Sequence, residues 1–193
     1  MKKETIDAFV EEVFALYEKK GAEAYAGEKV SQMEHMLQAA LLAEQEGYDE
    51  DVILAAFFHD IGHLCVTETQ ENQMNGFGTI DHETIGAHYI LGKGFTAKIS
   101  KLIQGHVKTK RYLVFKHEEY RNKLSEASLK TLGYQGGTMS PQEAFAFENE
   151  LWFELHLKMR EWDDKAKVEK MKTKPLHYYK EMAKKFLANN VSY

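Results

Sequence analysis

The chain has 193 residues, a formal net charge of −5, 44% hydrophobic and 28% charged residues, and only two prolines. This length suits one domain with a substantial core, and we predict a single domain over residues 1–193. The acidic balance gives no reason to expect nucleic-acid binding, because domains of that kind usually carry a basic excess. An anionic ligand must therefore meet a local positive site.

The cysteine content and the hydropathy pattern bear on the compartment. A single cysteine, Cys65, cannot form an internal disulfide, and no apolar signal-peptide core follows the first residues. No apolar run approaches the roughly 20 residues that a membrane-spanning helix needs. We therefore predict a cytoplasmic protein without a membrane segment. These features carry no information on its oligomeric state.

Apolar residues at spacings of three and four predict helices along most of the chain. Ser31 with Glu34 and Ser140 with Glu143 form capping boxes, which mark two helix starts. The stretch 66–80 lacks this spacing and predicts a surface loop that could form one wall of a site. The predicted helices cover residues 5–20, 31–47, 50–60, 81–92, from 96 past 106, 125–134, 140–163 and the stretch after 175.

No strand pattern, internal repeat or linker stands out between these segments. The sequence therefore predicts an all-α fold, an irregular helical bundle. Gly62 is interpreted as the stop of the third helix, so that His59 and Asp60 stand at a helix end.

Four histidines recur at intervals of 24, 23 and 24 residues, one on each of four predicted helices: His35, His59, His82 and His106. Imidazole nitrogens and carboxylate oxygens suit Fe, Mn and Zn, and the lack of cysteine ligands argues against a structural zinc site. His59 and Asp60 are neighbours, and neighbours on a helix diverge by about 100°. Both reach one cluster only if ligands arrive from several helices. Asp60 could then bridge two metal ions.

The alternative is that these are ordinary polar residues near helix ends. The set as a whole favours the metal site, because the His-Asp pair and three further histidines on separate helices would otherwise coincide by chance. We assign no function to His88, His117 and His156. Cys65 is expected to be a small buried hydrophobic residue rather than a ligand.

The order of these residues resembles the HD-domain superfamily, and specifically its branch of mixed-valent di-iron oxygenases. Most HD phosphohydrolases need only four such ligands, and two extra histidines favour the dinuclear branch, although dinuclear HD phosphodiesterases also exist. Over about residues 22–180 the chain resembles the group of 2-amino-1-hydroxyethylphosphonate oxygenases and their N-trimethyl-substrate relatives. The residues that carry this likeness are the ligand series His35, His59, Asp60, His82, His106 and Asp163, and the segments 25–28, 59–63, 105–106, 110–114, 127–128, 130–132, 134–137 and 162–163.

The resemblance implies an HD-type helical fold that holds two iron ions, one Fe(II) and one Fe(III), with O2 as co-substrate. It implies that one iron is held by His35, His59, Asp60 and Asp163. The second iron would be held by Asp60, His82 and His106, with room left for substrate.

The resemblance also implies that the phosphonate is held by Lys110, Ser128, Thr131, Gln135 and Arg160. Independently, Ser128, Thr131 and Gln135 lie at helical steps of three and four, on one face. Lys110 and Arg160 add two positively charged side chains, and charged donors make strong hydrogen bonds to an oxyanion. Judged from the residues alone, Ser128 and Thr131 could equally lie on an exposed helix surface. Lys110 and Arg160 could equally be charges in contact with solvent.

Three further residues receive roles from the resemblance. It implies that His63 hydrogen-bonds near the reacting carbon, that Glu28 faces the amino group of the substrate, and that Tyr25 occupies the substrate-side iron until substrate enters. Tyr25 and Glu28 stand three residues apart and share one face if a helical turn forms there. On residues alone, Tyr25 packs on the bundle and Glu28 is a solvated charge.

We therefore predict an enzyme, an O2-dependent di-iron oxygenase that cleaves the carbon–phosphorus bond of a small organophosphonate. The predicted substrate is a 1-hydroxy-2-aminoethylphosphonate with a free or a trimethylated nitrogen, and the products are phosphate and glycine or glycine betaine. The alternative is a metal-dependent HD phosphohydrolase that acts on a small phosphoester. A sensor or scaffold with an inactive HD fold would lack some of the ligands, and none is missing.

Overall fold

The computed structural model describes residues 2–25, 27–67 and 69–190. Within these ranges the chain forms eleven α-helices and no strand beyond two isolated bridges, between Ala24 and Ser31 and between Gln73 and Thr79. The all-α prediction is confirmed. The helices are α1 (Lys3–Lys20), α2 (Gln32–Gln45), α3 (Glu50–Phe58), α4 (Gly62–Cys65), α5 (His82–Gly92), α6 (Ala97–Lys116), α7 (Glu118–Lys123), α8 (Glu126–Tyr134), α9 (Pro141–Glu148), α10 (Phe153–Lys165) and α11 (Leu176–Asn190).

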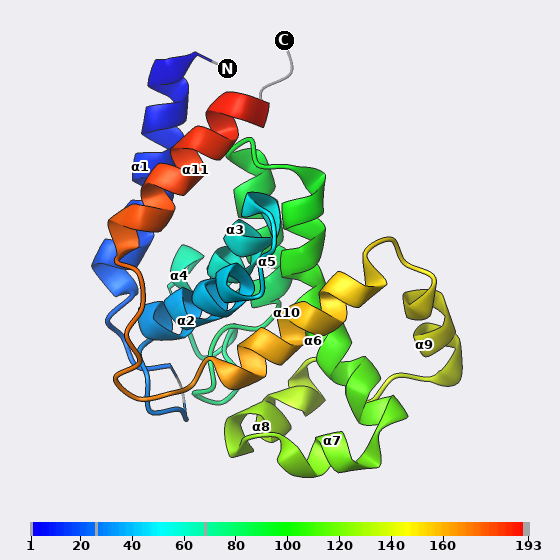
Figure 1. Cartoon of the computed structure of the whole chain (residues 1–193). Coiled ribbons are helices and arrows are strands. Elements are labelled where there is room, and N and C mark those ends of the chain that lie inside the picture. Colours follow the sequence, from blue (N-terminus) through cyan, green and yellow to red (C-terminus); the bar gives the residue numbers. More distant parts are fainter. Residues whose placement is uncertain (1, 26, 68, 191–193) are drawn as a thin grey trace.

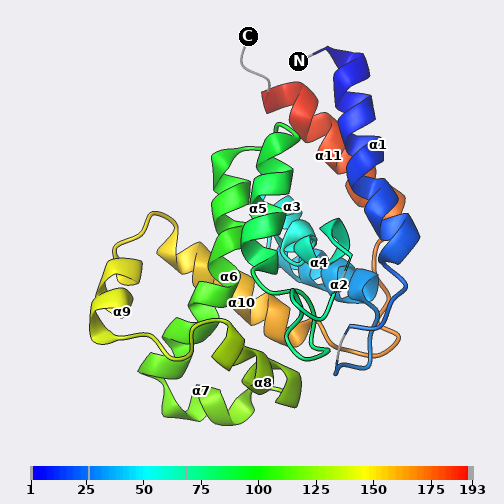
Figure 2. The same ribbon diagram turned by 180° about the vertical axis from the view of Figure 1, so that it is seen from behind.

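The helices form a central group that other helices cover at the periphery (Figure 1). Helices α2, α3, α5, α6 and α10 lie in the middle, and α1 and α11 run side by side along one edge. Helices α7, α8 and α9 lie around one end of the long helix α6, as the view from behind also shows (Figure 2). The central group is the part of the fold that positions the predicted metal ligands.

The core is built around α3, whose residues Val52–Phe58 are all buried. The ring of Phe57 stacks against Tyr17 of α1 at 4.7 Å and against Tyr179 of α11 at 5.0 Å between ring centroids. The hydroxyl of Tyr17 donates a hydrogen bond to the carbonyl of Phe57 at 3.1 Å. These contacts fix the C-terminal end of α3, where His59 and Asp60 follow.

The prediction of one continuous helix over residues 140–163 is wrong, because the chain forms two helices there, α9 and α10. Its start is confirmed, since Ser140 and Glu143 form the predicted capping box, as Ser31 and Glu34 do at α2. The break comes at Trp152, whose φ of 68° is left-handed and does not continue an α-helix. Directly after α9, the side chain of Asn149 donates to the carbonyl of Phe145 at 2.8 Å.

The interpretation of Gly62 as a helix stop is also wrong, because Gly62 is the first residue of the short helix α4. A Cβ atom at this position would lie 1.9 Å from the carbonyl oxygen of His82, so only glycine lets α4 approach α5 this closely. Helix α7 is absent from the predicted set as well. It has no buried residue, and so it lacks the apolar spacing on which the prediction depends.

Candidate metal centre and active site

The carboxylate of Asp60 lies at the centre of a buried cluster of imidazole rings. Its Oδ2 atom is 3.5 Å from Nε2 of His35 and 3.6 Å from Nε2 of His59. Its Oδ1 atom is 3.3 Å from Nε2 of His82 and 3.3 Å from Nε2 of His106. Each oxygen of one carboxylate therefore faces a different pair of histidines, which is the arrangement that a carboxylate bridging two metal ions requires.

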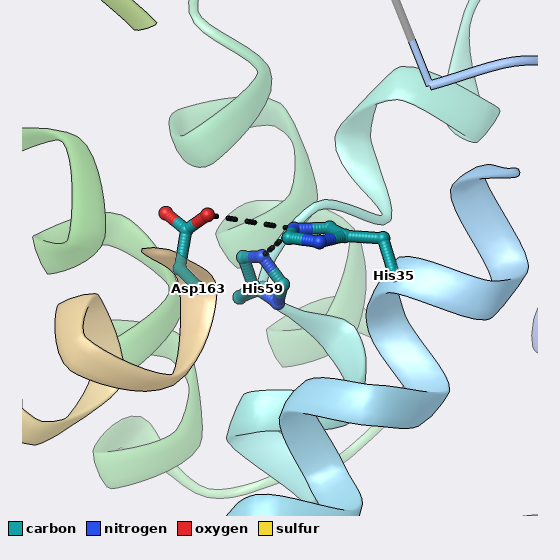
Figure 3. A group of neighbouring side chains, drawn as sticks. All are labelled: His35, His59 and Asp163. Carbon is teal, nitrogen blue, oxygen red and sulfur yellow. Dashed lines mark hydrogen bonds and ion pairs between the residues drawn. The ribbon is translucent and has the colours of Figure 1, made fainter. Parts of the chain in front are cut away.

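The first group consists of His35 from α2, His59 after α3 and Asp163 from α10 (Figure 3). Nε2 of His35 lies 3.4 Å from Oδ1 of Asp163 and 3.0 Å from Nε2 of His59. One ligand atom from each of the three side chains lies within 4.8 Å of the others. All three side chains are buried, so this group is enclosed by the bundle.

The second group consists of His82 from α5 and His106 from α6, on the other side of Asp60. Their Nε2 atoms are 3.1 Å apart. The ring of His63 stacks on that of His82 with centroids 4.0 Å apart, and Nδ1 of His63 accepts a hydrogen bond from the backbone amide of Thr79 at 3.0 Å. One ligand atom each of Asp60, His63 and His82 lies within 4.8 Å of the others. A neutral His63, however, carries its proton on Nε2, which makes it a hydrogen-bond donor rather than a ligand in this arrangement.

All four cluster histidines direct their Nδ1 atoms to backbone carbonyls, which only accept hydrogen bonds. Nδ1 therefore carries the proton, and a neutral ring presents a lone pair at Nε2. Facing lone pairs at 3.0 and 3.1 Å need a cation between them, and Oδ2 of Asp60 is buried without a hydrogen-bond partner. The carbonyls are those of Ala166 for His35, Ala56 for His59, Thr79 for His82 and Ile103 for His106, at 2.9, 2.8, 3.1 and 2.7 Å. These residues fit a pair of metal ions.

Burial and the neighbouring carboxylates shift the pKa values of the cluster histidines in opposite directions. Burial alone would lower the pKa of His35, but hydrogen bonds and charges of Asp163 and Asp60 outweigh it and raise the pKa to about 9. Burial lowers the pKa of His59 to about 4, against the attraction of Asp60. Without metal, the first group therefore holds a proton on His35 in the place of a metal cation.

A cavity of about 340 Å³ opens onto one side of the cluster only. Asp60, His82 and His106 line it, whereas His35, His59 and Asp163 do not. The stretch between α4 and α5 forms one wall with Met74, Gly76, Phe77 and Gly78, as predicted for the loop 66–80. A small molecule in this cavity therefore meets the second group and not the first.

A polar group of side chains from α6 and α8 forms another part of the cavity wall. Lys110 is buried, and its Nζ atom donates to Oγ1 of Thr131 at 2.9 Å and to the carbonyl of Ser128 at 3.4 Å. Burial, together with the nearby charge of Arg160, lowers the pKa of Lys110 to about 7. Lys110, Ser128, Thr131 and Gln135 all line the cavity, and the buried Oε1 atom of Gln135 lacks a hydrogen-bond partner.

The remaining wall comes from the segment before α2 and from Lys167, which follows α10. Tyr25 stacks on His35 with ring centroids 4.2 Å apart and lines the cavity. Glu28 also lines it, and its Oε1 atom lies 2.8 Å from Nζ of Lys167. Lys167 is a cavity residue that the sequence analysis missed. No spacing or motif singles it out within a lysine-rich stretch.

Arg160 differs from the other predicted phosphonate contacts, because it does not line the cavity. Its guanidinium donates to Oδ2 of Asp163 at 2.6 Å, to the hydroxyl of Tyr120 at 2.8 Å and to the carboxylate of Asp164. Arg160 therefore holds the carboxylate of Asp163, whose other oxygen faces His35.

Comparison with known proteins agrees with this geometry. Residues 33–145 match the model of the HD domain. An uncharacterised protein of Acanthamoeba polyphaga mimivirus is 44% identical over 95% of this chain and 84% of its own length. A 1-hydroxy-2-(trimethylamino)ethylphosphonate dioxygenase of Leisingera caerulea, named as forming glycine betaine, is 35% identical over 92% of this chain and 90% of its own length. A hydroxymethylphosphonate dioxygenase of Gimesia maris is 38% identical over 88% of this chain and 84% of its own length.

The chain belongs to the HD-domain family, and within it to the group that contains these phosphonate dioxygenases. The resemblance seen in the sequence is thereby confirmed. Separately, none of the helices in the described ranges has the length and hydropathy needed to cross a membrane.

Proposed function

We propose that this protein is an O2-dependent oxygenase that cleaves the carbon–phosphorus bond of a 1-hydroxyalkylphosphonate. The two dioxygenases named above act on phosphonates that share a hydroxyl group on the carbon bonded to phosphorus. The nitrogen-bearing substituent predicted from the sequence, amino or trimethylammonio, occurs in the name of one of these two substrates only. The shared hydroxyphosphonate unit therefore defines the substrate class.

One observation carries this proposal: the cavity joins the open half of the metal-binding cluster to a group of anion-binding side chains. Asp60, His82 and His106 lie at one wall, and Lys110 lies at another with the polar side chains of α8. A phosphonate held by Lys110, Ser128, Thr131 and Gln135 places the adjacent hydroxyl-bearing carbon toward the cluster. The charge-assisted contact from Lys110 explains how an acidic protein binds a dianion.

The proposed cofactor is a pair of iron ions in mixed oxidation states. The closed group would hold one with His35, His59, Asp163 and Oδ2 of Asp60, and the open group would hold the other with His82, His106 and Oδ1 of Asp60. When bound, the pair would supply a Lewis acid for the substrate oxygens and a redox centre that passes electrons from the substrate to O2.

The protein's own side chains then bind and orient the substrate and exclude water. His63, whose Nε2 atom carries the proton, donates a hydrogen bond beside the reacting carbon. Tyr25, which stacks on His35 and lines the cavity, would occupy the open position of the substrate-side iron until substrate enters. Arg160 is a positioning residue, because it acts on the site through the carboxylate of Asp163.

The atoms balance without a further reactant. The substrate carbon loses its bonds to hydrogen and to phosphorus and becomes a carboxylate carbon. The phosphorus leaves as phosphate, one oxygen atom of O2 enters each product, and the hydrogen leaves as a proton. O2 takes up four electrons, two from the C–H bond and two from the C–P bond.

Phosphate release with and without O2 tests the proposal. Iron-loaded protein should release phosphate from hydroxymethylphosphonate or its trimethylaminoethyl homologue in air and should stop when O2 is removed. The Asp60→Asn variant should lose both the metals and the reaction, whereas His88→Asn, which alters an exposed histidine outside the cavity, should keep both. Equal phosphate release from a phosphoester without O2 would instead identify the protein as a hydrolase.

A further inference from the structure

Lys167 forms a partly buried ion pair with Glu28 at the wall of the cavity. The two side chains are only 15% and 12% exposed, so their 2.8 Å contact is weakly screened by water. Nζ of Lys167 also lies 3.5 Å from Oγ of Ser125 and 5.9 Å from the ring centroid of Tyr25. The lysine thus lies between the segment before α2 and the start of α8, next to the phosphonate-binding side chains.

The backbone on both sides of Lys167 is fixed by α2. The carbonyl of Ala166 accepts the Nδ1–H of His35 at 2.9 Å. The side chain of Gln38 binds both backbone groups of Val168, each at 3.0 Å. Lys167 is therefore held between two anchored neighbours, and its side chain reaches the cavity from a rigid position.

The pair changes which charge the cavity accepts at this wall. A lone Glu28 would attract a cationic substituent of the substrate. With Lys167 on Oε1, the carboxylate is already neutralised, and a second cation beside it meets a like charge in a weakly screened site. An uncharged substituent meets no such repulsion.

We propose, on the basis of the hydroxyphosphonate oxygenase function above, that Lys167 is a specificity-determining residue. By neutralising Glu28 it favours hydroxyphosphonates with no substituent or a small uncharged one on the hydroxyl-bearing carbon, and it disfavours a cationic substituent. Preference for hydroxymethylphosphonate over the trimethylammonio substrate follows.

The first test measures kcat/KM of iron-loaded protein for these two substrates. Wild type should prefer hydroxymethylphosphonate, and Lys167→Met should raise the cationic-to-uncharged ratio by at least about tenfold, because it removes one like-charge contact. Lys165→Met is the matched control, since Lys165 pairs with Glu161 outside the cavity and should leave the ratio unchanged. Glu28→Gln added to Lys167→Met should abolish the new preference.

The second test is independent of turnover and so separates this inference from the oxygenase assignment. Calorimetry compares binding of ethylphosphonate and 2-aminoethylphosphonate, which lack the reacting hydroxyl. Lys167→Met, or Lys167→Gln if the first variant is unstable, should shift the ratio of dissociation constants toward the amine. An unchanged ratio, or a wild type that prefers the amine, overturns the specificity inference. Binding that shifts as expected without any O2-dependent turnover overturns the oxygenase proposal alone.

Discussion

Lys110 shows at the residue scale how burial makes an anion-binding side chain sensitive to pH. Its amine is buried, and that burial lowers the pKa of Lys110 to about 7. In the empty cavity Lys110 therefore loses its positive charge as the pH rises through neutrality. In the proposed function, a phosphonate dianion binds the protonated amine. Binding above pH 7 must therefore include the uptake of a proton, which weakens the observed affinity.

We predict that the advantage of wild type over Lys110→Met depends on pH. At pH 6 the variant should bind ethylphosphonate about 10- to 100-fold more weakly, as expected for the loss of one charge-assisted contact of about 1.5–3 kcal/mol. Above pH 7 the advantage should shrink by up to about tenfold per unit. Calorimetry at several pH values measures this, and the ionisation of the ligand cancels in the ratio. A constant ratio would show that Lys110 stays charged or does not contact the phosphonate.

The sequence predicts the residues that can meet at the site better than it predicts their geometry. His35, His59, His82 and His106 stand out because each lies on a separate helix at a regular interval, and the structure brings them together around Asp60. The division into a closed and an open group depends on which rings face the cavity, and no spacing encodes that. The same holds for Lys167, whose position depends on the distant side chain of Gln38.

At the scale of elements, the contact between α4 and α5 decides where two predicted ligands lie. Gly62 starts α4 against the backbone of His82, and Gly86 of α5 leaves space on the facing side, where a Cβ would lie 3.0 Å from the amide nitrogen of Gly62. His82 begins α5, and Asp60 lies just before α4. The two glycines therefore set the distance between the carboxylate and an imidazole of the open group.

We predict that Gly62→Ala destabilises the fold and lowers its metal content together. The added Cβ would lie 1.9 Å from the carbonyl of His82, so the helices must separate, at a cost of about 3 kcal/mol. Gly92→Ala at the end of α5 is the matched control, because its Cβ meets nothing within 4 Å and should be neutral or slightly stabilising. Thermal unfolding and metal analysis measure both effects. A Gly62→Ala protein with unchanged melting temperature and metal content would refute the close-contact explanation.

Element boundaries follow from the sequence only where local chemistry specifies them. The starts of α2 and α9 are predicted because Ser31 and Ser140 each form a capping box with a glutamate three residues later. The interruption at Trp152 is not predictable in this way, since a tryptophan gives no local preference for a left-handed backbone. Tertiary packing must impose that conformation.

At the scale of the whole molecule, the metal-binding cluster links segments that are far apart in the chain. His35 comes from α2, His59 and Asp60 follow α3, His82 and His106 come from α5 and α6, and Asp163 comes from α10. Metal ions bound there would connect the five helices of the central group, which lie together in the middle of the fold (Figure 1). Ligands that bind the folded chain alone stabilise it by mass action, so metal removal should lower the melting temperature of the entire fold.

The pH dependence of the stability that is lost on metal removal provides a sharper prediction. In the metal-free protein the pKa of His35 is raised to about 9, so its contribution to stability is complete below its unfolded value of about 6.5 and disappears as the pH rises to 9. This loss amounts to about 3 kcal/mol at most. Lys110 acts in the opposite sense in the metal-free protein, because its pKa is lowered to about 7, so stability increases with pH above that value.

His82 also has a raised pKa, because the hydrogen bond and charge of Asp60 outweigh burial, so the difference between the two forms reports on His82 as well as on His35. A metal ion must displace the proton of His35, so apparent metal affinity should rise up to about tenfold per pH unit from 6.5 to about 9 and then level off. Over the same range the gap in unfolding free energy between metal-loaded and metal-free protein should widen, at fixed free metal concentration. Chemical denaturation of both forms at several pH values measures the gap, and the same measurement on Lys110→Met removes the contribution of Lys110. A gap that does not vary with pH would mean that metal binding displaces no proton from His35, and the closed group would then not be a metal site.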